Sequence, residues 1–202
     1  MPRENQGINM KTIDWAAGVV FGALAVALNF TIRIPAPFAP FLYYQIWEIP
    51  LVAAFFLFGT QVLLFATGVN TIVLLIFFPG ALPLGPIYNM AAVLSMIAGV
   101  GFIKILLDRH ALKNLAIATI LYTSFGIAAR TAAMSIVNYV VLRYPSPVGF
   151  SLPEPAILLD IPLIAVFNAT LALYTVPIGY SAAKTVASVI ETSGHTTTST
   201  VT

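Results

Sequence analysis

Apolar residues run through this chain in long blocks, and short polar or proline-rich segments separate one block from the next. Most blocks approach the ~20 residues that cross ~30 Å of hydrocarbon as an α-helix. We therefore expect an all-α fold, a polytopic membrane protein built as a six-transmembrane-helix bundle with proline-rich outer loops. The predicted helices span residues 15–32, 46–58, 61–78, 87–107, 115–142 and 161–189.

The second and third helices follow from the length of a single block. Residues 46–78 would form a helix ~50 Å long if they were uninterrupted, and a reversal near Gly59 and Thr60 divides them into two. The six helices form one transmembrane domain over residues 15–190. A polar cytoplasmic N-terminus, residues 1–14, precedes it, and a disordered tail rich in Ser and Thr, residues 191–202, follows it.

Composition supports the membrane assignment. Of the 202 residues, 59% are hydrophobic and 8% are charged, which is roughly a third of the charged share in soluble domains. The chain contains no cysteine, which excludes disulfides, iron–sulfur clusters and thiolate catalysis. The net charge of +2 is too small and too scattered to indicate a nucleic-acid partner.

No catalytic motif is evident in the sequence. The histidines, His110 and His195, fall in a loop and in the tail, without a serine or an acid placed to form a triad. An HExxH metal motif is absent, and GYSAAKT, residues 179–185, lacks the glycine that phosphate loops carry directly before lysine. We therefore expect no enzyme activity, no cofactor and no metal site. Uphill transport would need an ion gradient or another subunit.

The positions of Lys and Arg predict the orientation in the membrane, because short loops rich in these residues stay in the cytoplasm. Six spans place both termini on one side. Six basic residues lie on that side and two, Arg33 and Arg143, on the other; the six are Arg3, Lys11, Lys104, Arg109, Lys113 and Lys184. Both termini are thus expected inside the cell, and twelve of the fourteen prolines lie in or beside the three outer connections.

Two similar segments place an acid near the start of a helix on the outer side. WEIPLVAAFF contains Glu48 and LDIPLIAVFN contains Asp160. An acid in the first helical turn can simply cap the helix. Alternatively, both acids line an outer pocket, because apolar walls with a few convergent polar groups are typical of small-molecule sites. The pocket would also contain the rings of Tyr43, Tyr44 and Trp47 and the amides of Gln45 and Asn89, although Tyr and Trp gather at membrane interfaces in any case.

Arg130 lies twelve residues inward of Leu142 in the fifth predicted helix, or ~18 Å along its axis. A charge at that depth is costly unless it is paired, and Glu48 and Asp160 are the outer acids that can reach it. Four asparagines also lie in or at the edge of helices and either bond neighbouring helices or face the pocket: Asn70, Asn89, Asn138 and Asn168.

Small residues recur at a spacing of four in the first predicted helix. Gly18 and Gly22 form GxxxG, and Ala23 and Ala27 form AxxxA. This spacing lets another helix approach closely. The neighbour is either a helix of the same bundle or a partner protein in the membrane.

Several segments resemble the substrate-binding S components of energy-coupling factor (ECF) transporters, most closely the riboflavin-binding branch. APFAPFLYYQIWEIPLVAAFFLFG resembles their first outer loop and second helix. GPIYNMAAV, with Asn89, resembles the start of their fourth helix, and SIVNYVVL, with Asn138 and Tyr139, resembles the outer end of their fifth. The resemblance implies a vitamin-binding subunit with its site under the outer loops. It also implies a T component and two ATPase subunits as partners, with Ala23 and Ala27 contacting the T component.

The sequence departs from the riboflavin branch at two places. The lysine that the branch carries five positions after a proline is matched by Ala182, five after Pro177, and its Lys-Asn pair in the third helix is matched by Val69 and Asn70. We expect a small, flat, largely uncharged, vitamin-like substrate, with riboflavin as the first candidate. The alternatives are a small secondary transporter or channel, or a structural or interaction membrane protein. The two similar segments run in the same direction, unlike the inverted repeats of many secondary transporters.

Overall fold

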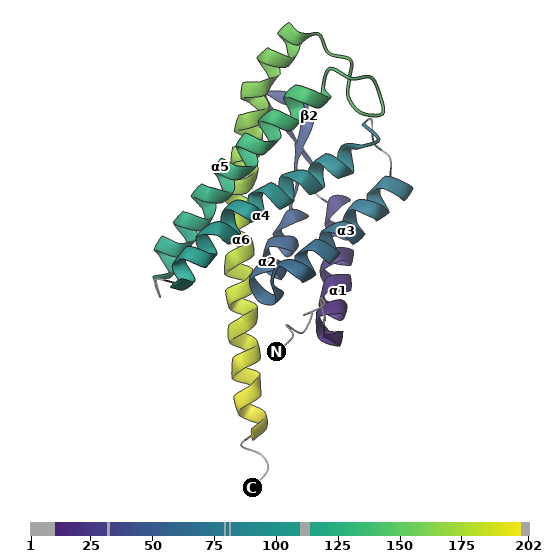
Figure 1. Cartoon of the computed structure of the whole chain (residues 1–202). Coiled ribbons are helices and arrows are strands. Elements are labelled where there is room, and N and C mark those ends of the chain that lie inside the picture. The colour runs from purple at the N-terminus through teal and green to yellow at the C-terminus, as the bar shows by residue number, and fades with distance from the viewer. Residues whose placement is uncertain (1–10, 32, 79, 81, 110–113, 199–202) are drawn as a thin grey trace, which may run out of the picture.

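The computed structural model describes residues 11–31, 33–78, 80, 82–109 and 114–198. Within these residues it contains six helices and one two-stranded hairpin (Figure 1). The elements are α1 (Thr12–Asn29), β1 (Ile34–Ala36), β2 (Ala39–Tyr44), α2 (Glu48–Phe58), α3 (Thr60–Phe77), α4 (Gly85–Arg109), α5 (Leu115–Val141) and α6 (Glu154–Thr198). Five helices are long and apolar enough to cross a membrane, and α2 is a shorter apolar helix.

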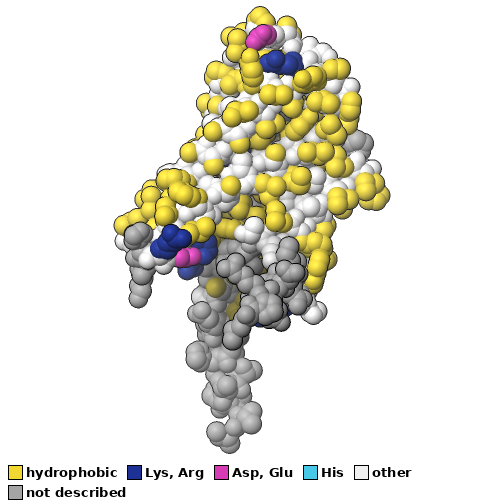
Figure 2. Space-filling view, viewed as in Figure 1, with side chains coloured by type: hydrophobic (Ala, Val, Ile, Leu, Met, Phe, Trp, Pro, Cys, Tyr) yellow, Lys and Arg dark blue, Asp and Glu magenta, His cyan; other side chains and the backbone are white. Residues whose placement is uncertain are grey.

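The predicted six-helix membrane bundle is therefore confirmed. Figure 2 shows hydrophobic side chains over most of the visible surface, with charged side chains gathered near its two ends. This is the surface that a helix bundle presents to lipid, because the hydrocarbon offers no partner for a charge. The chain is a multi-pass membrane protein.

The predicted reversal between the second and third helices is also confirmed. Gly59 joins α2 to α3 with φ of +87°, and its N–H donates to the carbonyl of Phe55 at 2.9 Å. Glycine suits this position because it has no Cβ to clash at positive φ. The 11 residues of α2 measure only ~16 Å, about half of the hydrocarbon thickness.

The last helix differs from the prediction at both ends. We expected residues 161–189, whereas α6 begins at Glu154 and continues to Thr198. The predicted start would make Pro162 a first-turn proline, but Pro155 holds that place and Pro162 lies inside the helix. Asp160 is consequently in the second turn and not at the helix start. The helix also enters the segment for which the sequence predicts disorder, while residues 199–202 lie outside the described residues.

A hairpin occupies the first proline-rich connection, where no strand was predicted. β1 and β2 pair antiparallel, with Pro35 opposite Tyr43 and an irregularity between Pro35 and Ala36. The hairpin packs on α6 through a cluster of Ala36, Phe167 and Leu171. The first predicted helix is correspondingly shorter, because α1 ends at Asn29, and its predicted last residue, Ile32, lies outside the described residues.

The core forms around α2, which packs against α1, α3 and α6. Leu51, Val52 and Ala54 of α2 are fully buried. The start of α1 and the end of α6 lie at one end of the bundle, together with the end of α4 and the start of α5 (Figure 1); we call this the terminal end. The hairpin, the α3–α4 connection and the α5–α6 connection lie toward the other end, which we call the loop end. Residues 1–10 and 110–113 lie outside the described residues. Which end of the bundle faces the cytoplasm stays a prediction from the positions of Lys and Arg.

Candidate ligand-binding site

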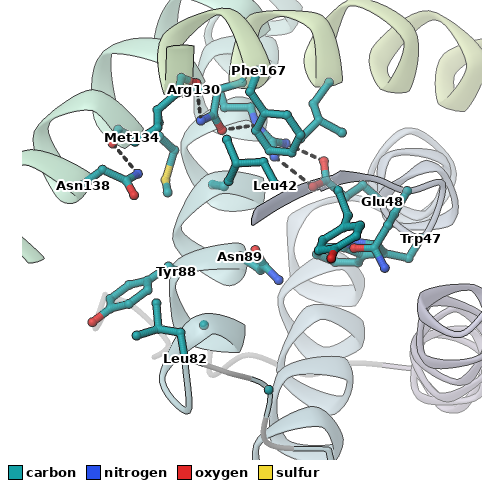
Figure 3. A pocket seen from close by; sticks show the side chains of 18 of the residues that line it. Leu42, Trp47, Glu48, Leu82, Tyr88, Asn89, Arg130, Met134, Asn138 and Phe167 are labelled. Atoms are coloured by element: carbon teal, nitrogen blue, oxygen red, sulfur yellow. Dashed lines mark hydrogen bonds and ion pairs between the residues drawn. The ribbon is translucent and has the colours of Figure 1, made fainter. Parts of the chain in front are cut away.

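A cavity of about 740 Å³ lies at the loop end, between the hairpin, the start of α2 and the walls of α4, α5 and α6 (Figure 3). Its volume is within the range of small-molecule sites, ~300–1,000 Å³. Most of the lining is apolar or aromatic, with a few amides. The lining residues are Arg33, Leu42, Tyr43, Gln45, Trp47, Glu48, Gly80, Leu82, Gly85, Tyr88, Asn89, Ala92, Arg130, Met134, Asn138, Leu142, Phe150, Ile164, Phe167, Asn168 and Leu171.

An ion pair between Glu48 and Arg130 forms part of the wall. Arg130 Nη1 and Nη2 donate to Glu48 Oε2 and Oε1 at 2.5 and 2.9 Å, and the two side chains are each 3% exposed. Arg130 Nε also donates to Asn168 Oδ1 at 2.9 Å. The bidentate geometry matches the planar guanidinium to the carboxylate, so both charges are satisfied inside the bundle.

The pairing explains why an acid stands at the start of α2. Both carboxylate oxygens of Glu48 accept from Arg130, and the helix cap at Trp47 has no side-chain hydrogen bond. Helix capping alone therefore does not account for Glu48. Of the two acids that could pair with Arg130, the structure selects Glu48, whereas Asp160 does not line the cavity.

Gln45 and four other predicted site residues line the cavity. Trp47 is buried, Tyr43 is partly exposed, and Asn89 and Asn138 project from α4 and α5. Figure 3 places Asn89 on the cavity wall between Tyr88 and Trp47. The amide of Asn89 has no hydrogen-bond partner among the described residues, while Asn138 Nδ2 donates to the carbonyl of Met134 at 2.7 Å. These amides have free polar atoms for a ligand.

Two predicted aromatic residues do not line the cavity. Tyr44 packs against Phe167 outside it and shares a hydrogen bond with Thr170 Oγ1 at 2.8 Å. Tyr139 is exposed and donates to Glu154 Oε1 at 2.9 Å. Adjacent side chains of one element point in different directions, and here Tyr43 and Asn138 line the cavity while Tyr44 and Tyr139 do not.

Sequence reasoning missed several lining residues. Met134 could have been found, because Arg130, Met134 and Asn138 recur at a spacing of four and so share one face of α5. Tyr88 precedes Asn89, and its hydroxyl donates to the carbonyl of Val148 at 2.7 Å, which ties α4 to the α5–α6 connection. No local pattern distinguishes Phe150 or Phe167 from other aromatic residues of the chain.

A second polar contact lies beside the cavity, where α1 ends. Asn29 Nδ2 donates to Asn70 Oδ1 at 2.9 Å, and the carbonyl of Asn29 accepts from Arg33 Nε at 3.0 Å and from Gln45 Nε2 at 3.1 Å. Asn70 thus bonds another helix, Asn168 both bonds Arg130 of α5 and lines the cavity, and Asn89 and Asn138 line the cavity. The hairpin segment is fastened to α1 and, through Tyr174 Oη donating to the carbonyl of Gln45 at 2.6 Å, to α6.

Comparison with known proteins identifies the fold. Neither a protein-family model nor a curated protein matches the sequence. A solved structure of the S component of a bacterial ECF transporter superposes with a TM-score of 0.71 and 20% sequence identity, over 90% of this chain and 99% of that chain. The chain has the S-component fold. The predicted likeness to S components is thereby confirmed for the fold, at an identity that leaves the substrate open.

Within the S-component fold, the two small-residue motifs of α1 face different ways. Gly18 and Gly22 are buried against α3, where an added Cβ would lie 2.4 Å from Phe65 Cδ1 and 3.1 Å from Val69 Cβ, respectively. Close packing inside the bundle therefore accounts for both glycines, and they do not form an outward partner surface. Ala23 and Ala27 are exposed on α1, and we refer to them as the alanine pair.

Proposed function

We propose that the chain is the substrate-capture subunit, the S component, of an ECF-type uptake transporter, and that its solute binds in the loop-end cavity. The observation that carries the proposal is a cavity of about 740 Å³, lined in part by the hairpin, in an S-component fold. A hairpin that packs on α6 through Phe167 and Leu171 can cover a bound molecule from the loop end. The Glu48–Arg130 pair would hold α2, α5 and α6 in the geometry of the site.

The charges and rings of the cavity support a flat, largely uncharged, vitamin-like substrate. Glu48 and Arg130 neutralise each other, which leaves Arg33 as the one lining charge without an ion pair among the described residues, and its Nε already donates to the carbonyl of Asn29. Tyr43, Trp47 and Tyr88 offer aromatic surface for a planar ring system, and Asn89 offers an amide to orient it. Riboflavin is the first candidate, because an isoalloxazine ring is planar, polar at its edges and uncharged at neutral pH.

The proposal also includes partner subunits. The sequence contains no phosphate-binding loop, so energy would come from two ATPase subunits coupled through a transmembrane T component. The alanine pair is the contact that we propose for the T component, because its exposed small side chains allow a partner helix to approach closely.

Riboflavin binding tests the substrate proposal. We expect the purified protein to be yellow or to quench the fluorescence of added riboflavin at submicromolar concentration, which corresponds to roughly −8 kcal/mol or better. Asn89→Ala should weaken binding about three- to tenfold, the range for one lost hydrogen bond. Tyr139→Phe is the matched control, because this residue lies off the cavity and its substitution should leave binding unchanged.

Two outcomes would contradict parts of the proposal. A colourless protein that leaves riboflavin fluorescence unchanged would remove riboflavin, and mass spectrometry of the molecule retained through purification would then identify the substrate. Uptake by the chain alone, in vesicles that contain no ATPase subunits, would indicate a secondary transporter or channel and overturn the S-component proposal itself.

A further inference from the structure

A second cavity, of about 290 Å³, lies at the terminal end and shares no lining residue with the loop-end cavity. We call it the terminal-end cavity. It is enclosed by the last turn of α2, the end of α4, the start of α5 and the later part of α6. Its lining residues are Phe56, Leu57, Lys104, Leu107, Asp108, Ala118, Tyr122, Tyr180, Ala183, Lys184 and Ala187.

Two buried tyrosines line this cavity without a bonded hydroxyl. Tyr122 is 5% exposed and Tyr180 is 8% exposed. Their rings pack on each other at 5.1 Å between centroids and on Phe56 at 5.1 and 4.6 Å. Neither hydroxyl has a hydrogen-bond partner among the described residues. Neither hydroxyl oxygen is among the fully buried unpaired side-chain atoms of the described residues, so both oxygens are accessible from the cavity and can bond a group that enters it.

The charges that surround the cavity favour an anion. Lys104 and Asp108 satisfy each other through an ion pair of 2.7 Å. Lys184 has no ion pair among the described residues, and its Nζ lies 5.7 Å from the centre of the Tyr180 ring. One free ammonium and two free hydroxyls can donate together to oxygen atoms that carry negative charge, as in a phosphate.

The depth of the cavity indicates where that phosphate comes from. Lys184 follows Glu154 by 30 positions along α6, or ~45 Å, which equals the bilayer thickness with both headgroup layers included. Lys184 therefore lies at headgroup depth when the Glu154 end lies at the opposite surface. Exposed hydrophobic residues on the same helices, Ile105 and Val186, face the lipid beside the cavity. Figure 2 shows charged side chains at this lower end beneath a largely hydrophobic surface.

We propose that the terminal-end cavity binds the phosphate of an anionic phospholipid. The phosphate accepts from Lys184 Nζ and from the hydroxyls of Tyr122 and Tyr180, and the acyl chains remain in the bilayer. Lysines and tyrosines also gather at membrane interfaces without binding a particular lipid. Interfacial tyrosines of that kind face the lipid, however, whereas Tyr122 and Tyr180 are buried and aimed into a cavity.

Native mass spectrometry of the full chain in detergent tests this proposal. The probes are phosphatidylglycerol, phosphatidylcholine and inorganic phosphate, each titrated separately. We expect phosphatidylglycerol to bind at one site and more tightly than the other two. Lys184→Gln and the double variant Tyr122→Phe, Tyr180→Phe should each weaken its binding about tenfold, as loss of charge-assisted hydrogen bonds implies. Arg109→Gln removes a basic residue from the same end, outside the cavity lining, and should bind normally.

Several results would overturn the proposal. Equal weakening by Arg109→Gln would mean that general surface charge, not the cavity, attracts the lipid. Equal binding of phosphatidylcholine, or binding of inorganic phosphate in its place, would rule out an anionic lipid as the specific ligand. Variants that bind phosphatidylglycerol normally but fail to assemble with partner subunits would assign the cavity to an acidic protein segment. If Lys184→Gln does not fold, the tyrosine variant decides, because Phe preserves the ring packing.

Discussion

The buried ion pair between Glu48 and Arg130 allows a quantitative prediction about the free energy of unfolding. Glu48→Met would leave the Arg130 guanidinium buried, with Asn168 Oδ1 at 2.9 Å and Met96 Sδ at 3.7 Å as its remaining partners. Removing one member of a buried ion pair costs about 3–5 kcal/mol, because the other charge stays desolvated. Glu48→Met should therefore lower the free energy of unfolding by that amount.

Arg130→Met should cost at least as much, because it leaves both the carboxylate of Glu48 and the side-chain oxygen of Asn168 without their donor. The double variant, with Met at both positions, removes both charges and fills the space with apolar side chains of similar length. Replacing a whole buried pair by apolar residues is often neutral or stabilising. The double variant should thus be more stable than either single variant, with a coupling energy of about 3–5 kcal/mol.

Unfolding in detergent micelles with increasing sodium dodecyl sulfate, followed by fluorescence of the two tryptophans, measures these free energies. Asp160→Asn is the control, because Asp160 has no ion pair among the described residues and its loss should change stability by less than about 1 kcal/mol. A double variant less stable than both single variants would refute the reasoning, since the two charges would then not depend on each other.

Three further predictions concern packing, assembly and orientation. Gly99→Ala should destabilise the bundle by about 1–3 kcal/mol, because the added Cβ would lie 2.3 Å from the carbonyl oxygen of Phe125 in α5. Gly68→Ala is the control: its added Cβ would meet no atom within 4 Å, so it should be neutral or slightly stabilising in the same assay. Leucine at both positions of the alanine pair should abolish ATPase-dependent uptake without loss of ligand binding, and loss of both would instead place the pair in the packing of the bundle. Cysteine introduced at Ser146 should react with an impermeant reagent added outside cells, and cysteine at Lys113 should not; the reverse labelling would invert the predicted topology.

The sequence predicts the helices well because the signal for each helix is local. The length of each apolar block locates a helix, and Gly59 marks the reversal because glycine can adopt positive φ. The start of α6 is ambiguous in sequence, because Pro155 and Pro162 both follow an acid within two residues and both suit a first turn. The hairpin has no two-residue alternation to reveal it, and its packing on Phe167 of α6 is a contact between residues far apart in the chain.

The site was harder to predict than the helices, because its ion pair joins residues that are far apart in the sequence. The cost of a charge in hydrocarbon shows from the sequence alone that Arg130 needs an acid. Which acid serves depends on how α2 and α6 pack against α5, and the partner, Glu48, is 82 positions away. Tyr43 and Tyr44 both lie in β2, and which of them lines the cavity depends on how the hairpin packs on Phe167 of α6.

The short helix α2 joins the two ends of the molecule mechanically. Its first residue, Glu48, forms part of the loop-end cavity, and Phe56, ~12 Å further along the axis, forms part of the terminal-end cavity. Most of the residues between them are buried on every side, and close-packed interiors resist compression. The helix is therefore stiff along its axis. An axial displacement of Glu48 would also move Phe56 against the rings of Tyr122 and Tyr180 in the terminal-end cavity.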